Sequence, residues 1–207
     1  MTLFEVGVVV AVLMVAVALL LPGFLNSRRR ASRINCVNNL RQVALAYRVW
    51  EGDNGDKYPM GTSVTNGGTM ELAATGNVLA SFLVMSNELS TPRILVCPED
   101  TNRIAAHSLA GLAARANISY FVGVDAASDL APRLFLSGYG NFAIGGAAVS
   151  SGLLPLWTNA PVSWTTLRHV DSGNLALADG SVFQTDGKLL IQMLCETGLA
   201  TNRLALP

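Results

Sequence analysis

The chain opens with a nearly unbroken apolar segment. The run from Val6 to Leu21 contains no charged side chain, and Glu5 is the one charged residue ahead of it. With that single interruption, the segment from Leu3 to Leu25 is long enough, at about 1.5 Å per helical residue, to span a hydrocarbon core of roughly 30 Å. No Lys or Arg precedes Arg28, whereas a cleaved secretory signal peptide would begin with basic residues and have a shorter apolar core. The pattern predicts a membrane helix.

Apolar positions after this segment follow a helical period. Pro22 and Gly23 predict an interruption or kink, because proline lacks a backbone donor and clashes with the preceding turn, while glycine adds backbone freedom. Beyond them, apolar residues recur at spacings of four and three, which is typical of an amphipathic helix that faces a core. This apolar stripe consists of Cys36, Leu40, Val43, Tyr47 and Trp50. The glycines and polar residues at 52–55 predict the end of the helix.

The remaining residues predict short elements of both kinds. The expected elements are a loop at 61–68, helical turns at 71–88 broken at Gly76-Asn77, a strand at 93–97 ended by Pro98, a strand at 119–124, a hairpin from Asn174 to Gln184, and a helix from Lys188 to Cys195. We therefore predict an α+β fold. A long N-terminal α-helix, residues 1–52, packs on one globular domain, residues 53–207, that contains a small antiparallel β-sheet.

The predicted hairpin has the clearest local pattern. Asp179-Gly180 separates two apolar stretches, and this pair favours a two-residue type I′ turn because both positions need a positive φ that Gly accepts and Asp tolerates. Four apolar side chains are expected to supply much of the burial in the hairpin: Leu175, Leu177, Val182 and Phe183. On this prediction, Gly180→Val misfolds the domain.

Composition narrows the possible functions. Hydrophobic residues make up 51% of the chain, charged residues 14%, and the formal net charge is zero, which argues against a nucleic-acid binder because phosphate neutralisation needs a basic surface. His107 and His169 are the only histidines. Neither lies in a metalloprotease or nucleophile-elbow motif, and no glycine-rich phosphate loop precedes a helix. The chain is not expected to be an enzyme.

Glu5 is the most unusual residue of the apolar segment. A carboxylate costs roughly 2.5 kcal/mol or more at the centre of a membrane helix, so it is a functional hypothesis that needs a partner. The partner that the sequence offers is the α-amino group of Met1. One helical turn places the two groups more favourably between neighbouring chains than within one chain. Glu5 therefore indicates assembly of chains through this helix.

The N-terminus and several later segments resemble one bacterial family. Met1-Thr-Leu-Phe-Glu5, the Val/Ala/Leu-rich sequence after it and Leu19-Leu-Leu-Pro22 resemble the mature N-terminus of type IV pilins and type II secretion pseudopilins. Further segments are similar to prepilin-type, pseudopilin G-like proteins of Verrucomicrobia and related bacteria: 33–42, 82–100, 118–125, 169–182 and 197–207. Two features depart from the family: the Gly before the cleavage point is absent, and Gly7 replaces a bulkier apolar residue.

The resemblance implies a pilin-like fold and a structural protein. On this basis the chain is the processed form, with Met1 as the N-methylated residue and with Glu5, Pro22 and Gly23 as assembly residues. A basic leader, already removed, would explain how the domain leaves the cytoplasm although Arg28, Arg29, Arg30 and Arg33 follow the span.

The same resemblance implies the partners and the location. Prepilin peptidase and an assembly platform would act on the chain in the inner membrane, and identical subunits would then form an extracellular type IV pilus-like filament. Two alternatives stay open: a periplasm-spanning pseudopilin of type II secretion, and a single-span, membrane-anchored domain that binds a ligand.

The cysteines and acidic residues give the remaining site predictions. A domain outside the cytoplasm keeps its disulfides, so Cys36 and Cys97, both within family-like segments, are expected to pair and to leave Cys195 as a buried free thiol. G-type pseudopilins carry calcium, but the candidate ligands here, Asp125, Asp171 and Asp179, are dispersed, so no metal or other cofactor is expected. His169 with Asp171 and Asp179 suggests a cation or hydrolytic site, although turn-stabilising hydrogen bonds are favoured for such residues.

Overall fold

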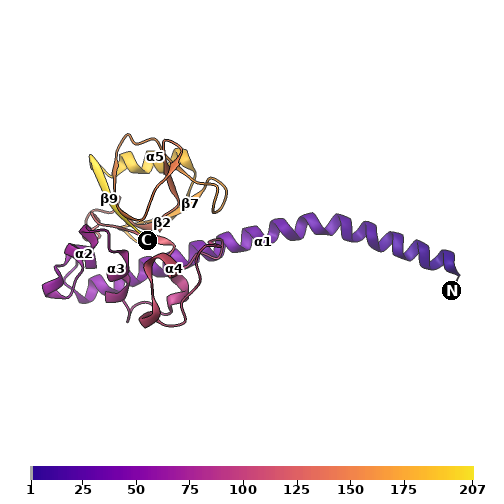
Figure 1. The fold of residues 1–207 in the computed structure, drawn as a ribbon, viewed down its shortest axis with the longest axis horizontal. Coiled ribbons are helices and arrows are strands. Elements are labelled where there is room, and N and C mark those ends of the chain that lie inside the picture. Colours follow the sequence, from indigo (N-terminus) through magenta and orange to yellow (C-terminus); the bar gives the residue numbers. More distant parts are fainter. Residues whose placement is uncertain (1) are drawn as a thin grey trace.

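One long helix projects from a globular domain (Figure 1). The computed structural model describes residues 2–207, apart from the side chains of residues 21–29. Helix α1 spans Leu3–Asp53. It ends where the sequence predicts, since Gly55 follows with a φ of 70°, a conformation in which glycine commonly terminates a helix.

Helix α1 is continuous through Pro22 and Gly23, so the predicted interruption is wrong for the single chain. Proline removes one backbone hydrogen bond, and a helix of 51 residues can absorb that loss as a bend. Figure 1 shows α1 as an arched, unbroken helix. The side chains around this position lie outside the described residues.

The other helices are short. They are α2 Met70–Ala74, α3 Val78–Val84, α4 Ala114–Asn117, α5 Gly187–Glu196, and 3₁₀ turns at Pro59–Gly61, Val64–Asn66, Pro92–Leu95 and Leu109–Gly111. The predicted break at Gly76-Asn77 is confirmed, because the Asn77 side chain caps α3 by accepting from Ala80 N at 3.2 Å. The predicted strand at 93–97 is wrong. Pro92 starts a 3₁₀ turn there, since its fixed φ suits the first position of a helix.

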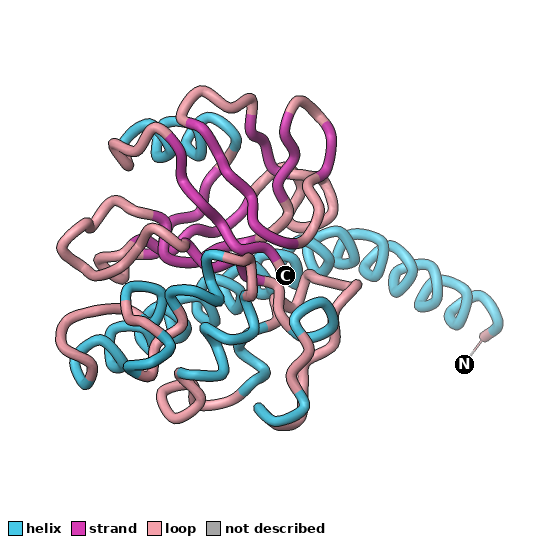
Figure 2. The backbone as a smooth tube through the Cα atoms, turned by 60° about the vertical axis from the view of Figure 1, so that its left-hand side comes forward, coloured by secondary structure: helices cyan, strands magenta, loops and turns pink. Residues whose placement is uncertain are grey.

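Within residues 2–207, nine strands form two antiparallel sheets. Figure 2 shows the strands in magenta. The strands are β1 Tyr120–Gly123, β2 Phe135–Tyr139, β3 Phe142–Ile144, β4 Ala147–Ala148, β5 Gly152–Trp157, β6 Val162–Trp164, β7 Gly173–Leu177, β8 Val182–Thr185 and β9 Thr201–Leu206. The larger sheet has the order β5-β9-β1-β2-β7-β8, and the smaller one β4-β3-β6. The α+β class is confirmed, and the C-terminal strand lies inside the larger sheet.

The core forms where α1 meets the larger sheet. Helix α1 packs against β2, β7 and β8, and Figures 1 and 2 show α5 on the opposite side of the strands. The predicted apolar stripe is confirmed, because all five of its side chains are buried: Cys36, Leu40, Val43, Tyr47 and Trp50. The second half of α1 is therefore part of the domain core, while its first half extends away from it.

The hairpin of β7 and β8 forms at the predicted position with a different turn. Leu177 N donates to Ser181 O, and Gly180 N donates to Leu177 O, both at 2.9 Å. The loop therefore contains three residues, and only Gly180, with a φ of 83°, is left-handed. Asp179 instead accepts from Ser181 N at 2.8 Å. This is a type I turn closed by a left-handed glycine, which matches strand twist as a type I′ turn does.

Burial in the hairpin follows the prediction on one strand only. Leu175 and Leu177 in β7 are buried, whereas Phe183 in β8 is 42% exposed. The difference arises because β8 is the outer strand of the larger sheet. The core contribution of this hairpin is therefore smaller than the sequence suggests.

We expect Gly180→Val to destabilise the domain by about 1–2 kcal/mol, the cost of a left-handed β-branched residue. The site is open enough that an added Cβ meets only Arg48 at 3.7 Å, so strain in the backbone decides the effect and complete misfolding is not expected. Denaturant unfolding measures the loss. Gly180→Asn, which tolerates this conformation, is the matched control, and equal losses for both variants would contradict this account.

Candidate functional sites: an exposed apolar helix and a buried disulfide cluster

The described first part of α1, Leu3–Leu20, packs against no other part of the chain. The segment Leu3–Leu20 has a mean hydropathy of 2.8, and none of it is buried. By length and composition this helix can anchor in a membrane, and an N-terminal signal sequence has the same properties. Its apolar surface needs lipid or another protein to cover it.

Glu5 caps the start of this helix. Thr2 N donates to Glu5 Oε2 at 2.7 Å, and Glu5 N donates to Thr2 Oγ1 at 3.4 Å. This reciprocal pair is a capping box, which satisfies two backbone donors at the helix N-terminus. Met1 lies outside the described residues, so its expected ion pair with Glu5 stays a prediction.

Exposed apolar side chains recur on α1 beyond the membrane-length segment. Ile34, Leu45 and Val49 are 60%, 62% and 48% exposed, and their spacing of eleven and four residues places them on one side of the helix. A groove beside this side is lined by Leu45, Arg41 and the hairpin residues 179–183. This part of α1 can accept a second apolar element.

The predicted disulfide joins α1 to the domain. Cys36 and Cys97 are bonded, their Cα atoms are 5.2 Å apart, and their sequence separation is 61. Closing a loop of that length contributes about 4 kcal/mol in the chain-entropy model.

Cys195 is exposed, so its predicted burial is wrong. Its neighbours Met193 and Leu194 face the core, and Cys195 falls outside that face of α5.

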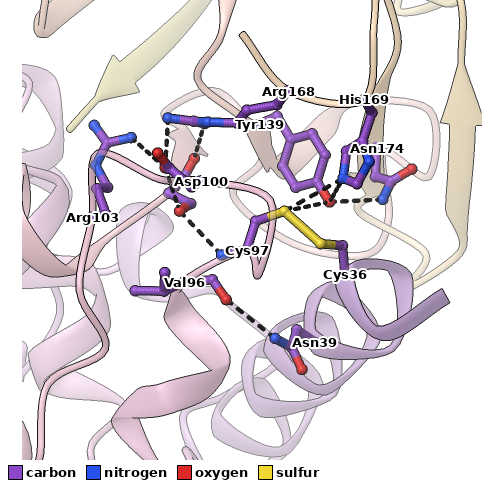
Figure 3. The surroundings of a disulfide bond; sticks show 11 residues. Cys36, Asn39, Val96, Cys97, Asp100, Arg103, Tyr139, Arg168, His169 and Asn174 are labelled. Atoms are coloured by element: carbon purple, nitrogen blue, oxygen red, sulfur yellow. Dashed lines mark hydrogen bonds and ion pairs between the residues drawn. A yellow bond between two sulfur atoms is a disulfide. The ribbon is translucent and has the colours of Figure 1, made fainter. Parts of the chain in front are cut away.

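Three polar side chains surround the disulfide (Figure 3). His169 Nε2 lies 3.2 Å from Tyr139 Oη and 3.4 Å from Cys97 Sγ. Asn174 Nδ2 donates to Tyr139 Oη at 3.0 Å. The bonded sulfur carries no proton, so the single Tyr139 hydroxyl proton points either to the sulfur or to the imidazole. All of these side chains are buried, and they form a polar cluster under the sheet.

The backbone that carries His169 is strained. His169, Val170 and Asp171 have φ values of 51°, 45° and 53°, and each left-handed residue that is not glycine costs roughly 1–2 kcal/mol. Arg33 Nη2 donates to the His169 carbonyl at 2.9 Å, which ties this turn to α1. The strained turn holds His169 over the disulfide.

The three candidate calcium ligands lie in separate settings. Asp125 accepts from Arg203 N at 2.6 Å and pairs with its guanidinium, Asp179 closes the hairpin turn, and Asp171 is exposed. Among the described residues these carboxylates do not gather into one cluster. The turn role expected for Asp179 is confirmed.

A buried ion pair, which the sequence analysis does not predict, lies beside the disulfide. Asp100 Oδ2 accepts from Arg168 Nη2 at 2.6 Å, from Ser119 Oγ at 2.7 Å and from Arg103 Nη1 at 3.1 Å. Burial lowers the pKa of Arg168, although the Asp100 carboxylate opposes the shift. Ser119 Oγ also accepts from Cys97 N at 3.1 Å, so the ion pair and the disulfide form one connected structure.

His169 should make stability depend on pH. Burial lowers its pKa below the ordinary value of 6.5; nearby Arg33 and Arg168 act in the same direction, and Glu99 opposes them. Below pH 6.5 the unfolded chain binds a proton that the folded chain excludes, so stability falls by at most about 1.4 kcal/mol per pH unit until the folded pKa is reached.

We expect this loss of stability to disappear in His169→Gln and to persist in His107→Gln, which changes an exposed histidine. Denaturant unfolding of the oxidised protein at several pH values between about 7.5 and about 5.5 measures it. An unchanged pH dependence in His169→Gln would contradict the assignment.

Known proteins add nothing to these observations. No protein-family model matches the chain, and neither a curated protein nor a solved structure is significantly similar to it.

Proposed function

We propose that the chain is a structural subunit that polymerises through α1 into a helical, type IV pilus-like filament. The observation that carries the proposal is the exposed apolar surface of α1, which consists of Leu3–Leu20 and of Ile34, Leu45 and Val49 farther along the helix. Lipid can cover only the first part, because Arg30 and Arg33 separate it from the later residues and favour the membrane surface. A second subunit can cover both parts.

The attachment of α1 to the domain supports the same proposal. The second half of α1 belongs to the core, and the Cys36–Cys97 bond fixes it covalently. Contacts made along the helix therefore set the position of the whole domain. Repeated head-to-tail contacts of one kind generate an open helical polymer when they do not close into a ring.

A groove in the structure supports one alternative function, that of a ligand-binding domain. An open groove of about 570 Å³ is lined by Arg30, Arg33, Glu99, His169 and Val170, among others. A groove of this size and charge can hold a small anionic ligand, as a single-span, membrane-anchored binding domain would require. A secretion pseudopilin shares the proposed assembly and differs in filament length and location.

Electron microscopy of filaments sheared from cells tests the proposal. We expect filaments from the wild-type chain and none from Leu45→Glu, which puts a charge on the exposed side of α1. Ile104→Glu changes an exposed apolar residue outside α1 (77% exposed) and should still assemble.

Three other outcomes would count against the proposal. Filaments from Leu45→Glu would overturn the role of α1. A wild-type chain that forms no filaments and stays monomeric in detergent, with measurable affinity for an anionic ligand, would favour the anchored binding domain. Short, periplasmic assemblies would favour the pseudopilin.

A further inference from the structure

The disulfide cluster contains three atoms that commonly bind metal ions. Cys36 Sγ, Cys97 Sγ and a ring nitrogen of His169 all lie within 4.8 Å of one another, and all three residues are buried. Two thiolates and one imidazole are a typical ligand set for zinc. The disulfide needs only the two cysteines, so the third group in this cluster requires its own explanation.

We propose that the reduced chain binds a thiophilic divalent cation of the zinc type between Cys36, Cys97 and His169. The same three side chains would then hold either a disulfide or a metal ion, according to the redox state. This inference does not depend on the proposed function, because it concerns the domain and not the exposed part of α1.

The distances fit a tetrahedral site. With Zn–S near 2.3 Å and Zn–N near 2.0–2.1 Å, a sulfur and a nitrogen ligand lie roughly 3.5 Å apart. Cys97 Sγ and His169 Nε2 are 3.4 Å apart. The Cα atoms of Cys36 and Cys97 are 5.2 Å apart, so once the bond is cleaved, rotation about the Cα–Cβ bonds can separate the sulfurs without moving the backbone.

Neighbouring groups supply a fourth position and a supporting shell. Tyr139 Oη lies 3.3 Å from Cys97 Sγ and 3.2 Å from His169 Nε2, close enough to donate to a bound thiolate or to hold a water ligand. Asn174 fixes that hydroxyl at 3.0 Å. Partners of this kind orient metal ligands and strengthen binding.

The strained backbone gives an independent reason to assign a role to His169. Three consecutive left-handed residues that are not glycine begin at His169, and strain of this kind concentrates at functional sites, where it fixes a group in position. Here it directs an imidazole nitrogen at a sulfur atom. If the side chain at position 169 only filled space, an apolar ring in an unstrained turn would serve equally well.

Metal binding requires that the disulfide first be reduced, and a dithiol is the reductant. The dithiol gives two electrons and two protons to the Cys36–Cys97 bond, which becomes two thiols, while the dithiol itself becomes a cyclic disulfide. Metal binding then releases the two thiol protons. Two thiolates neutralise the charge of a divalent cation, so the buried site gains no net charge.

Cobalt titration of the full chain in detergent tests the proposal. The Cys195→Ser background removes the exposed free thiol, and a dithiol keeps the protein reduced. We expect a thiolate-to-cobalt charge-transfer band that zinc displaces. The band should disappear in Cys36→Ser and in Cys97→Ser, and the affinity should fall at least about tenfold in His169→Gln. His107→Gln is the matched histidine control and should bind as the background does.

Several results would overturn the proposal. These are the absence of the band in a reduced, folded chain, equal affinity in His169→Gln and in the background, and binding by the oxidised chain. Protease resistance of the domain, measured in the same samples, reports folding. A band that appears only after this resistance is lost would show binding to the unfolded cysteines and would also overturn it.

Discussion

If the chain assembles as we propose, Glu5→Gln abolishes filament assembly and leaves the start of α1 intact. Glu5 Oε2 accepts from Thr2 N in the capping box, and glutamine serves this role as well as glutamate does. The substitution therefore removes the negative charge and keeps the cap. In an apolar filament core, the ammonium group of Met1 in an adjacent subunit would lose its counter-charge, and an uncompensated buried charge costs about 3–5 kcal/mol.

Thr2→Ala is the complementary control, because it removes the other half of the cap and keeps the charge. Losing an N-cap side chain costs about 1 kcal/mol, which should weaken the first turn of the helix and leave assembly largely intact. Counting sheared filaments by electron microscopy and measuring membrane-bound subunit separates assembly from insertion. Normal filaments from Glu5→Gln, or their loss in Thr2→Ala alone, would show that capping and not charge is the role of Glu5.

Local sequence patterns predict most of the α-helices, although they miss α4 and the 3₁₀ turns. The stripe from Cys36 to Trp50, the end of α1 near Gly55 and the helix α5 near Lys188 all follow from periodicity and from end residues that act within a few positions. Pro22 is the exception, because a proline pattern alone does not say whether a long helix breaks or bends.

Local sequence patterns predict the sheets less well. Strand β1 and the hairpin at Asp179-Gly180 have local patterns, whereas β9 lies between β5 and β1, and its partners are distant in the chain. Such pairing depends on which surfaces meet after folding. The turn at Pro92 is predicted as a strand because apolar residues follow the proline. Proline also favours the first position of a helix, and here it starts a 3₁₀ turn.

The sequence likewise predicts one part of the disulfide cluster and not the other. The Cys36–Cys97 bond follows from the family resemblance, but nothing local in the sequence brings His169, Tyr139 and Asn174 to it. Tyr139 ends β2, whereas Asn174 lies in β7 and His169 in the turn before it, and the pairing of β2 with β7 brings them together. The signal available in the sequence is that the chain has only two histidines. This makes His169 a candidate site residue, but it does not indicate which residues lie next to it.

Asp100→Asn is expected to destabilise the domain by about 3–5 kcal/mol, the typical cost of leaving a buried charge without its partner. The Asp100 side chain is 1% exposed and that of Arg168 is 9% exposed, so water cannot replace the lost carboxylate. An ordinary domain is stable by only about 5–15 kcal/mol, so this loss is a large fraction of the total stability. Denaturant unfolding of the oxidised protein measures the loss.

Two further variants show whether the buried charge is the cause. Glu99→Gln changes the neighbouring, half-buried carboxylate and should alter stability by less than about 1 kcal/mol. Arg168→Met added to Asp100→Asn removes the stranded charge and should recover a large part of the loss, because replacing both members of a buried pair by groups of similar volume is often nearly neutral. If the double variant is no more stable than Asp100→Asn, the carboxylate acts mainly through its hydrogen bond from Ser119, which positions the backbone at Cys97.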